Sequence, residues 1–369
     1  MTMNKIRIGI THGDFNGIGY EIILKVLEDD RCVELFTPVL YGSIQAFSYY
    51  KKGLGINISL RHNIVSSAAD AVDGVLNIVD VNTEGGEVTV MHGQHSALAG
   101  KLAEHAIAVA REDLLAGSID AVVTAPINKG VMGLNGFPFV GHTEFFAEPF
   151  KGSTEPMMLF STDVLKVALL TIHVPLSEVS NFVTKDRVLS SIEALERTMQ
   201  QDFGVEKPRI AVLGLNPHAG EDGLLGREEV EVIAPAVKEA WEAGYRVFGP
   251  FAADGFWGSG NYRQFDVVLS MYHDQGLLPF KLLAMDEGVN VTCGLPIIRT
   301  SPDHGTAFDI AGKGEASEAS LRNAIYCAID IHRNRERHRE ATTNPLQKQY
   351  VERGKDNVRL DLSKSDDEF

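Results

Sequence analysis

Residues 266–281 read DVVLSMYHDQGLLPFK, a short apolar run that leads directly into a histidine, an aspartate and a glutamine. The run FDVVLSMY (265–272) has the length and the Val/Leu content of a strand that is buried on both faces. In open α/β sheets, the carboxyl ends of the strands carry the chemistry. The residues His273, Asp274 and Gln275 therefore indicate either an ordinary strand end or part of a functional site.

Similar apolar runs recur along the chain and alternate with longer segments of helical periodicity. Five further buried strands are predicted, at 5–11, 36–42, 75–81, 119–126 and 209–217. Amphipathic helices, most of them followed by glycine, are predicted at 96–117, 184–204, 226–244 and 320–340. The segment 155–176 holds two apolar runs and predicts a hairpin. This alternation is typical of parallel βαβ units, so the expected fold class is α/β.

Composition narrows the class of protein. The chain has 369 residues, enough for about two domains. Its net charge of -16, without a cluster of basic residues, disfavours nucleic acid as a partner, whereas an anionic small molecule needs only one or two cations. No apolar run approaches the length of about 18 residues that spans a membrane. The chain is therefore expected to bind neither nucleic acid nor a membrane.

The cysteines and the N-terminal sequence bear on the compartment. Cys32, Cys293 and Cys327 are odd in number, far apart and without CxxC spacing, which favours a reducing environment. The first residues enter a predicted strand at once and lack the pattern of a secretory signal. We therefore expect a cytoplasmic protein.

Polar or glycine-containing motifs follow five of the predicted strands. They are ITHGDFNGIG (10–19), TAPINKG (124–130), TIHVPL (171–176), LNPHAGEDG (215–223) and MYHDQG (271–276). Their shared position predicts one crevice. The first motif is glycine-rich but does not have the spacing GxGxxG, so it is no dinucleotide fingerprint and could equally be a tight turn that packs a helix on a strand.

Three of these motifs place a histidine just after a strand: His173, His218 and His273. A single histidine at such a place is more often structural, but three equivalent ones favour a site. Three imidazoles with one open position are a known catalytic metal arrangement. Asp274 could orient one ring as a hydrogen-bonding carboxylate. The residues alone leave both a metal site and structural histidines open.

Other polar residues indicate an anion site. In GHTEFFAEPF (141–150), His142, Thr143 and Glu144 lie where a helix is expected to begin. Thr143 and Glu144 could cap and charge this helix, whereas a hydroxyl and backbone amides at its start also suit an anion. Further along, Lys281, Asn290 and Arg299 stand among apolar neighbours. A cation in such surroundings is costly unless it meets an anion.

The string SPDHGTAFDIAGKG (301–314) resembles the cofactor loop of the metal-dependent β-decarboxylating dehydrogenases that act on isopropylmalate and isocitrate. The resemblance implies that NAD or NADP is bound here. The implied cofactor-binding residues are His304, Gly305, Thr306 and Asp309.

Taken in order, these strings resemble the 4-hydroxythreonine-4-phosphate dehydrogenase family of vitamin B6 synthesis over nearly the whole chain. The resemblance implies that His173, His218 and His273 hold a divalent metal, with Zn²⁺ expected and Mg²⁺, Mn²⁺ or Co²⁺ as alternatives. It also implies a substrate site of His142, Thr143, Lys281, Asn290 and Arg299.

The same resemblance implies an architecture. We expect two α/β/α domains with largely parallel sheets and an interdomain active-site cleft, as in isopropylmalate dehydrogenase. Residues 1–130 with 287–345 would form the first domain, and 131–286 the second, which would carry the metal ligands and the dimer interface. The polar segment 354–369 is expected to be a frayed tail. The family resemblance further implies a homodimer whose active site draws metal ligands from both subunits.

The implied activity is NAD(P)-dependent oxidation of 4-phosphooxy-L-threonine to 2-amino-3-oxo-4-(phosphooxy)butanoate, which decarboxylates to 3-amino-2-oxopropyl phosphate. Asp254, His142 and Asp274 are the candidate proton acceptors. The chain departs from the usual family pattern at Phe15, Asn16, Tyr20 and Gly255. A sugar-acid 4-phosphate, such as threonate or erythronate 4-phosphate, is therefore the alternative substrate.

Two other classes of function compete with a dehydrogenase. A metal-dependent hydrolase could use the same histidines, but hydrolysis needs no dinucleotide loop. A non-catalytic binding protein for phosphorylated metabolites would need no metal with an open position. Both are therefore disfavoured.

Overall fold

Twelve strands form one mixed sheet in this computed structural model, which describes residues 5–55, 60–152, 155–284 and 286–344. The strands are β1 (Arg7–Thr11), β2 (Thr37–Gly42), β3 (His62–Val65), β4 (Leu76–Asp80), β5 (Ala121–Thr124), β6 (Met157–Ser161), β7 (Lys166–Leu169), β8 (Ile210–Leu213), β9 (Val247–Phe251), β10 (Val267–Ser270), β11 (Val289–Cys293) and β12 (Arg299–Pro302). Their order in the sheet is β3-β4-β2-β1-β5-β12-β11-β6-β7-β10-β8-β9.

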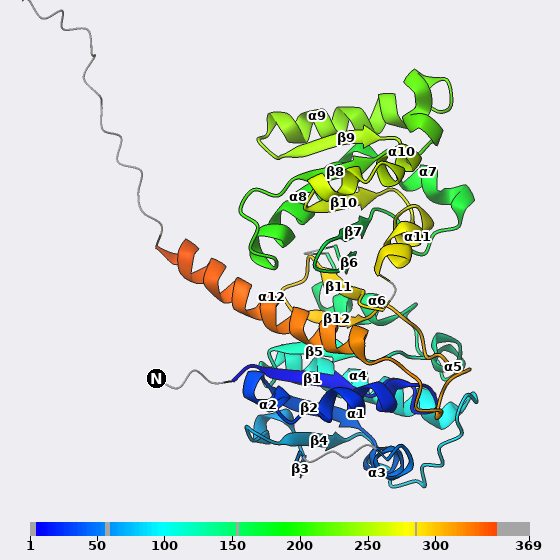
Figure 1. The fold of residues 1–369 in the computed structure, drawn as a ribbon, viewed down its shortest axis with the longest axis vertical. Coiled ribbons are helices and arrows are strands. Elements are labelled where there is room, and N and C mark those ends of the chain that lie inside the picture. The colour runs from blue at the N-terminus through cyan, green and yellow to red at the C-terminus, as the bar shows by residue number, and fades with distance from the viewer. Residues whose placement is uncertain (1–4, 56–59, 153–154, 285, 345–369) are drawn as a thin grey trace, which may run out of the picture.

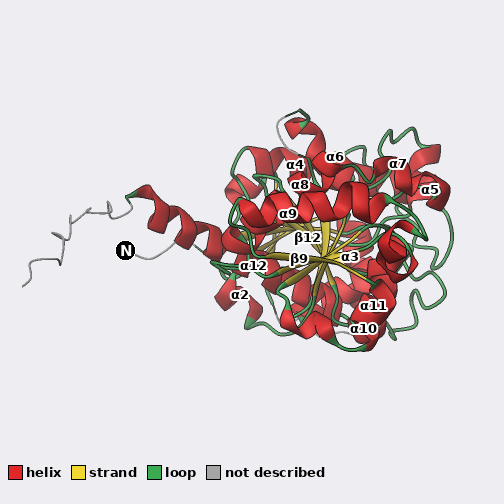
Figure 2. Ribbon diagram, turned by 90° about the horizontal axis from the view of Figure 1, so that it is seen from above, coloured by secondary structure: helices red, strands yellow, loops and turns green. Residues whose placement is uncertain are grey.

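Helices cover both faces of this sheet (Figure 2). They are α1 (Gly19–Leu27), α2 (Cys32–Leu35), α3 (Ile44–Gly53), α4 (Ala97–Leu115), α5 (Lys129–Leu134), α6 (His142–Ala147), α7 (Val179–Phe182), α8 (Lys185–Gln201), α9 (Ala234–Glu242), α10 (Ala253–Gly258), α11 (His273–Ala284) and α12 (Ala319–Thr343). No helix of the described ranges is long and apolar enough to cross a membrane.

The sheet consists of two parallel halves joined by antiparallel strands (Figure 1). Strand β1 pairs in parallel with β2 and β5, and β10 pairs in parallel with β7 and β8. Between these halves, β11 is antiparallel to both β12 and β6, and β6 is antiparallel to β7. The α/β class with a largely parallel sheet is thus confirmed, while the two halves share one continuous sheet.

The strands and helices expected from the local patterns are largely confirmed. Each of the six predicted buried strands is present, the segment 155–176 contains the β6–β7 hairpin, and helices begin at Gly19 and His142. The single helix expected over 226–244 is instead a π-helical turn, η5 (Glu229–Ile233), followed by α9. In this turn Glu229 points back to the loop after β8, a tertiary contact that periodicity does not encode.

Four strands were missed: β3, β9, β11 and β12. Their sequences, HNIV, VFGPF, VNVTC and RTSP, are short, and polar residues, glycine or proline interrupt any apolar run. Such sequences do not read as buried strands, and neighbouring strands rather than propensity hold them in place. Because β11 lies between the two halves, the expected domain boundary near residue 287 stays a prediction. The expected tail, 354–369, lies outside the described residues.

The glycine-rich turn after β1 packs tightly on neighbouring loops. Gly13 has a φ of +71°, and a Cβ there would come within 2.3 Å of the Pro126 carbonyl oxygen. A Cβ at Gly17 would come within 2.7 Å of the Thr306 carbonyl oxygen, which also accepts a hydrogen bond from Ile18 N at 3.1 Å. The turn therefore brings the exit of β5 and the proposed cofactor loop together.

Helix α12 carries the chain across the middle of the molecule. Its N-terminal half packs against β12 and β5, with Leu321, Ala324, Ile325 and Ala328 buried. Its C-terminal half projects from the body (Figure 1). The buried half anchors β12, the strand that supplies the central arginine of the site.

Candidate functional site

A cavity of about 260 Å³ opens beside the carboxyl ends of β5 and β12. Its walls come from the exit of β5, the start of α6, one residue of β11 and the loop after β12. Its polar and charged lining includes Lys129, His142, Thr143, Glu144, His173, Asn290, Arg299 and His304, with Gly305 beside them. Segments far apart in the sequence thus meet at one cavity, between the two halves of the sheet.

Arg299 is a buried cation that pairs with no carboxylate of the described residues. Only 3% of its surface is exposed, and its guanidinium donates to Thr124 Oγ1 at 2.7 and 3.2 Å and to Thr292 Oγ1 at 3.2 Å. It forms no ion pair with any described residue. Burial lowers the pKa of Arg299 to about 9, and the charge of Glu144 opposes this shift. A cation in this state is expected to meet an anionic ligand.

Buried polar atoms without partners gather around this arginine. Among the described residues, His142 Nε2, Glu144 Oε2, Asn290 Oδ1 and His304 Nε2 are buried and lack a hydrogen bond, and all four side chains line the cavity. Leaving such an atom unpaired costs about 1–3 kcal/mol. Burial, together with the charges of Arg299 and Lys129, holds the pKa of His142 well below its usual range, so this ring is neutral at pH 7. The cluster fits a polar ligand.

The three candidate metal ligands follow three adjacent strands, β7, β10 and β8. The ring centroids of His173 and His273 lie 6.4 Å apart. Asp274 Oδ1 lies 2.7 Å from His273 Nδ1, and Glu144 Oε1 lies 3.8 Å from His173 Nδ1. In the described part of the chain, His218 does not complete a three-residue cluster with these rings. The structure therefore brings two of the three histidines together.

His218 lies in η4 (Pro217–Gly223), where five consecutive residues, 218–222, have positive φ. The start of this loop is held by the buried carboxylate of Glu229. That group accepts from the backbone N–H groups of Leu215 and Asn216, both at 2.7 Å, and from Asn216 Nδ2 at 2.9 Å. The left-handed backbone is thus maintained by a specific buried contact, as is usual where strain serves a site.

Gln275, the last residue of the opening HDQ string, joins two of the histidine-bearing strands. Its Oε1 accepts from Met271 N at 2.8 Å, and its Nε2 donates to the Gly214 carbonyl at 2.6 Å. These bonds link the end of β10 to the end of β8. The helix α11 begins at His273 itself, so the residues after the strand are helical and not an ordinary turn.

Some of the other predicted site residues line the cavity, and some lie outside it. Thr143, Asn290, His304 and Gly305 line the cavity. Lys281 lies outside it, with its Nζ 3.5 Å from Asp303 Oδ1. Thr306 contributes its backbone carbonyl to the turn after β1. Asp254 and Asp309 are exposed and do not line the cavity.

Two residues of the cavity were not expected to act there. Lys129 belongs to the TAPINKG motif, and Glu144 had been considered only as a residue that charges a helix end. The signal for Lys129 was its place directly after a buried strand. The sequence position of Lys129 does not reveal which residues surround it, because these come from the start of α6.

The departures at Phe15, Asn16 and Tyr20 do not line the cavity either. Tyr20 is fully buried and donates to the Ser43 carbonyl at 2.9 Å, and the Asn16 side chain holds the backbone of Met91 and Gln94. These side chains therefore have structural roles. They do not contact the cavity directly, and the alternative substrate stays a prediction.

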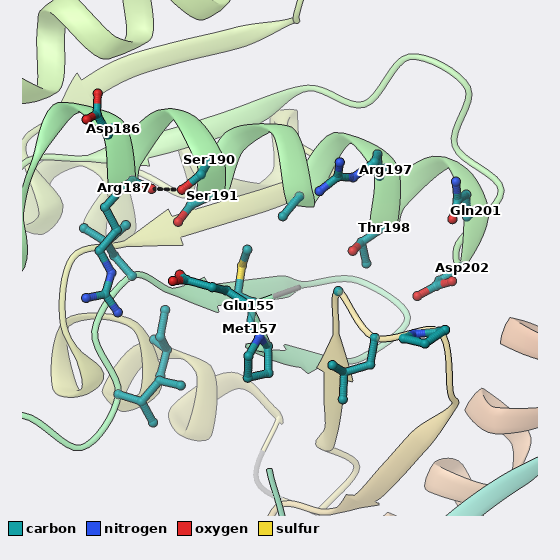
Figure 3. A pocket seen from close by; sticks show the side chains of 18 of the residues that line it. Glu155, Met157, Asp186, Arg187, Ser190, Ser191, Arg197, Thr198, Gln201 and Asp202 are labelled. Atoms are coloured by element: carbon teal, nitrogen blue, oxygen red, sulfur yellow. Dashed lines mark hydrogen bonds between the residues drawn. The ribbon is translucent and has the colours of Figure 1, made fainter. Parts of the chain in front are cut away.

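A larger cavity of about 820 Å³ lies between α8 and the β6–β7 region (Figure 3). Arg187, Ser190, Ser191 and Arg197 face it from α8. None of the predicted site residues lines this cavity. The cluster of unpaired polar atoms therefore singles out the smaller cavity as the candidate active site.

Comparisons with known proteins find relatives along nearly the whole chain. A relative from Bacteroides thetaiotaomicron named 4-hydroxythreonine-4-phosphate dehydrogenase is 49% identical over 368 residues, which cover 100% of both chains. A relative from Symbiobacterium thermophilum, whose name refers to D-threonate 4-phosphate dehydrogenase, is 41% identical and covers 86% of this chain and 94% of its own.

The fold also matches a solved structure. The crystal structure of 4-hydroxythreonine-4-phosphate dehydrogenase from Klebsiella pneumoniae is 36% identical and superposes with a TM-score of 0.75, covering 90% of this chain and 99% of that one. The family described as pyridoxal phosphate biosynthetic protein PdxA matches residues 34–328. With both halves of the sheet and most of the candidate site inside that match, the chain belongs to the PdxA family.

Proposed function

We propose that this protein is a metal- and NAD(P)-dependent dehydrogenase that oxidises 4-phosphooxy-L-threonine, with decarboxylation of the product to 3-amino-2-oxopropyl phosphate. The observation that carries the proposal is the cavity in which buried Arg299 lacks a carboxylate partner and four other side chains hold unpaired polar atoms. The names of the relatives, several of them 4-hydroxythreonine-4-phosphate dehydrogenases, support this substrate.

Arg299 would bind an anionic group of the substrate with two parallel hydrogen bonds, the geometry that a guanidinium favours. Thr143 and Asn290 line the same cavity and would hold the polar middle of the substrate. Lys281 would approach from outside the cavity, after exchanging its contact with Asp303. His142 presents a neutral, unpaired ring nitrogen and is the candidate acceptor that best fits the hydroxyl proton. Asp254 and Asp274 remain the alternative acceptors.

His173 and His273 would hold the divalent ion together with His218. The fit rests on the hydrogen bond between His273 Nδ1 and Asp274, because a carboxylate on one ring nitrogen orients the other towards a metal. Imidazole ligands favour Zn²⁺, with Mg²⁺, Mn²⁺ and Co²⁺ as alternatives. When bound, the ion lowers the pKa of an alcohol and polarises a ketone.

The dinucleotide, NAD or NADP, would lie along the loop that contains His304, Gly305, Thr306 and Asp309. His304 Nε2 is buried and unpaired, which fits a ligand at this place. Nicotinamide supplies the acceptor for the hydride. The packing of this loop on the turn after β1 would hold the cofactor at the same edge of the sheet as Arg299.

We also propose a homodimer in which the site is shared. Leu278 and Leu282 on α11 are 62% and 78% exposed, and Leu224, just beyond η4, is 76% exposed. Large apolar side chains gathered on the elements that carry His273 and His218 fit an interface between two copies of the chain. The partner subunit's His218 would then join His173 and His273.

A cytoplasmic location fits the cysteines, because Cys32, Cys293 and Cys327 are all free thiols.

The decisive test is an assay with pure protein, 4-phosphooxy-L-threonine, NAD⁺ or NADP⁺ and Zn²⁺. We expect reduced nicotinamide to form in step with the 3-amino-2-oxopropyl phosphate product. Threonate and erythronate 4-phosphates serve as parallel substrates, because one relative is named for the threonate compound. Release of inorganic phosphate without any reduced nicotinamide would instead show a hydrolase and refute the proposal.

A further inference from the structure

We infer that Lys129 is a further substrate-binding residue, which binds an anionic group of the substrate at the rim of the cavity. The inference rests on the proposed function for the identity of that substrate. It concerns the TAPINKG motif, which follows β5 and to which the proposal above gives no role.

The backbone at Lys129 is fixed by its neighbours. Asn128 caps α5 by accepting from Val131 N at 3.1 Å, and its side-chain nitrogen lies 3.0 Å from His95 Nδ1. Lys129 is the first residue of this helix. Its Cα is therefore held five residues beyond β5, next to Thr124 and Ala125 in the wall of the cavity.

The side chain of Lys129 runs past Gly141 at the start of α6. A Cβ at Gly141 would lie 3.3 Å from Lys129 Cε, 3.4 Å from its Nζ and 3.4 Å from Glu144 Oε2. The absence of a side chain at Gly141 thus leaves space for the lysine to reach the cavity. Any larger residue there would crowd both the lysine and the glutamate.

The ammonium group of Lys129 forms no hydrogen bond or ion pair with a described residue. No carboxylate of the described residues lies within ion-pair distance of its Nζ, whereas Lys281 is paired with Asp303. Glu144, the acidic side chain that lines the same cavity, has its Oε1 3.8 Å from His173 Nδ1. The interaction with His173 and, to a smaller extent, the charge of Lys129 lower the pKa of this carboxyl, but the lysine does not pair with it directly. An unpaired cation is common on a surface, but this one lines a cavity that already contains the buried Arg299.

The two cationic side chains of the cavity outnumber its one carboxylate. Lys129 and Arg299 bring two positive charges, and Glu144 brings one negative charge that is shared with His173. The proposed substrate has a carboxylate at one end and a phosphate at the other. Arg299 can bind one of them at the floor of the cavity, and Lys129 is placed to bind the other at the rim.

The test compares Lys129→Met with wild type and with a control, Lys207→Met. Lys207 is an exposed lysine in the loop before β8 and does not line the cavity. Calorimetric titration with 4-phosphooxy-L-threonine, without cofactor, should show about tenfold or greater loss of affinity for Lys129→Met and less than about twofold for Lys207→Met. KM should rise by a similar factor, kcat should change much less, and Lys129→Arg should recover part of the loss.

A second ligand identifies the group that Lys129 binds. The compound 3-amino-2-hydroxypropyl phosphate keeps the phosphate, hydroxyl and ammonium groups but lacks the carboxylate. A loss of affinity in Lys129→Met that disappears with this ligand assigns the lysine to the carboxylate, and a loss that persists assigns it to the phosphate.

Unchanged affinity of Lys129→Met for the full substrate would overturn the inference while leaving the proposed function intact. If the wild type turns over threonate 4-phosphate instead, the proposed substrate fails and the same comparison with that ligand still decides the role of Lys129. A wild type that binds neither compound would overturn both.

Discussion

The two sides of the candidate site differ in how complete they are within one chain. On the anion side, Arg299 is 3% exposed and is framed by Thr124 and Thr292. On the histidine side, the side chains of His173 and His273 are 39% and 43% exposed, and the third histidine does not join them. One side is closed by its own chain, whereas the other is open.

This difference indicates where a second chain would be needed. Burying an unpaired cation costs free energy, and on the anion side this cost is offset only when an anionic ligand binds. The open side has instead two rings, a left-handed loop and exposed leucines, features that fit completion by another subunit. The comparison predicts that substitutions on the two sides will fail in different ways.

The largest effect is expected on the open side. His273→Ala should lose bound metal, and turnover should fall by about a thousandfold or more, because a ligand loss exceeds the 10- to 100-fold typical of residues that only orient a ligand. The melting temperature should stay close to wild type, since the side chain is partly exposed. Metal analysis together with steady-state kinetics checks this. Full metal content with full activity would remove His273 from the site.

A smaller loss, of a different kind, is expected on the closed side. Arg299→Met should weaken substrate binding by about 3 kcal/mol, or about 150-fold, because the substrate anion loses a buried charged partner. Metal content should not change, and stability should hold or rise because a buried cation is removed. Calorimetry and thermal unfolding measure both. A KM within about twofold of wild type would make Arg299 structural.

Mixed dimers test whether the open side is shared. Chains with His218→Ala and chains with His273→Ala should be inactive alone. After subunit exchange they should recover about a quarter of wild-type activity, because half of the dimers are mixed and each has one intact site. The control mixture of His173→Ala with His273→Ala should stay inactive, as both rings lie in one chain. The reverse pattern would place His173 across the interface.

The smallest effect is a pH dependence confined to the closed side. The pKa of Arg299 is lowered to about 9 in the ligand-free protein, so its charge is present below pH 9 and is lost as the pH rises through that value. Substrate affinity should therefore fall by up to about tenfold per pH unit above 9. The same titration in Arg299→Met should be flat. Metal affinity should not show this step.

The free protein should change in the opposite direction. Because the unfolded chain keeps the ordinary, higher pKa of arginine, it binds more protons than the folded chain above pH 9, so this residue makes stability rise with pH there. Thermal unfolding of wild type against Arg299→Met, between pH 8 and 10, measures the difference. Parallel curves would mean that the guanidinium keeps its proton.

Local patterns in the sequence were sufficient for the regular elements and for the residue types of the site. The run 265–272 is a buried strand, and the helices at 96–117 and 184–204 form as expected, because periodicity reports which face an element buries. The motifs also placed His173 and His273 directly after neighbouring strands, where chain topology brings them together.

Only the tertiary structure decided which groups share a cavity and which are left unpaired. The sequences of β11 and β12 lack the apolar pattern of buried strands, yet both strands are buried and pair with β6 and β5. Arg299 is left with an uncompensated charge because its partner is the hydroxyl of Thr124, 175 residues away, and not a carboxylate of the described residues. Lys129 meets the start of α6 only across the space left by Gly141. Burial and pairing depend on contacts between segments that are distant in the sequence, so local sequence patterns do not reveal them.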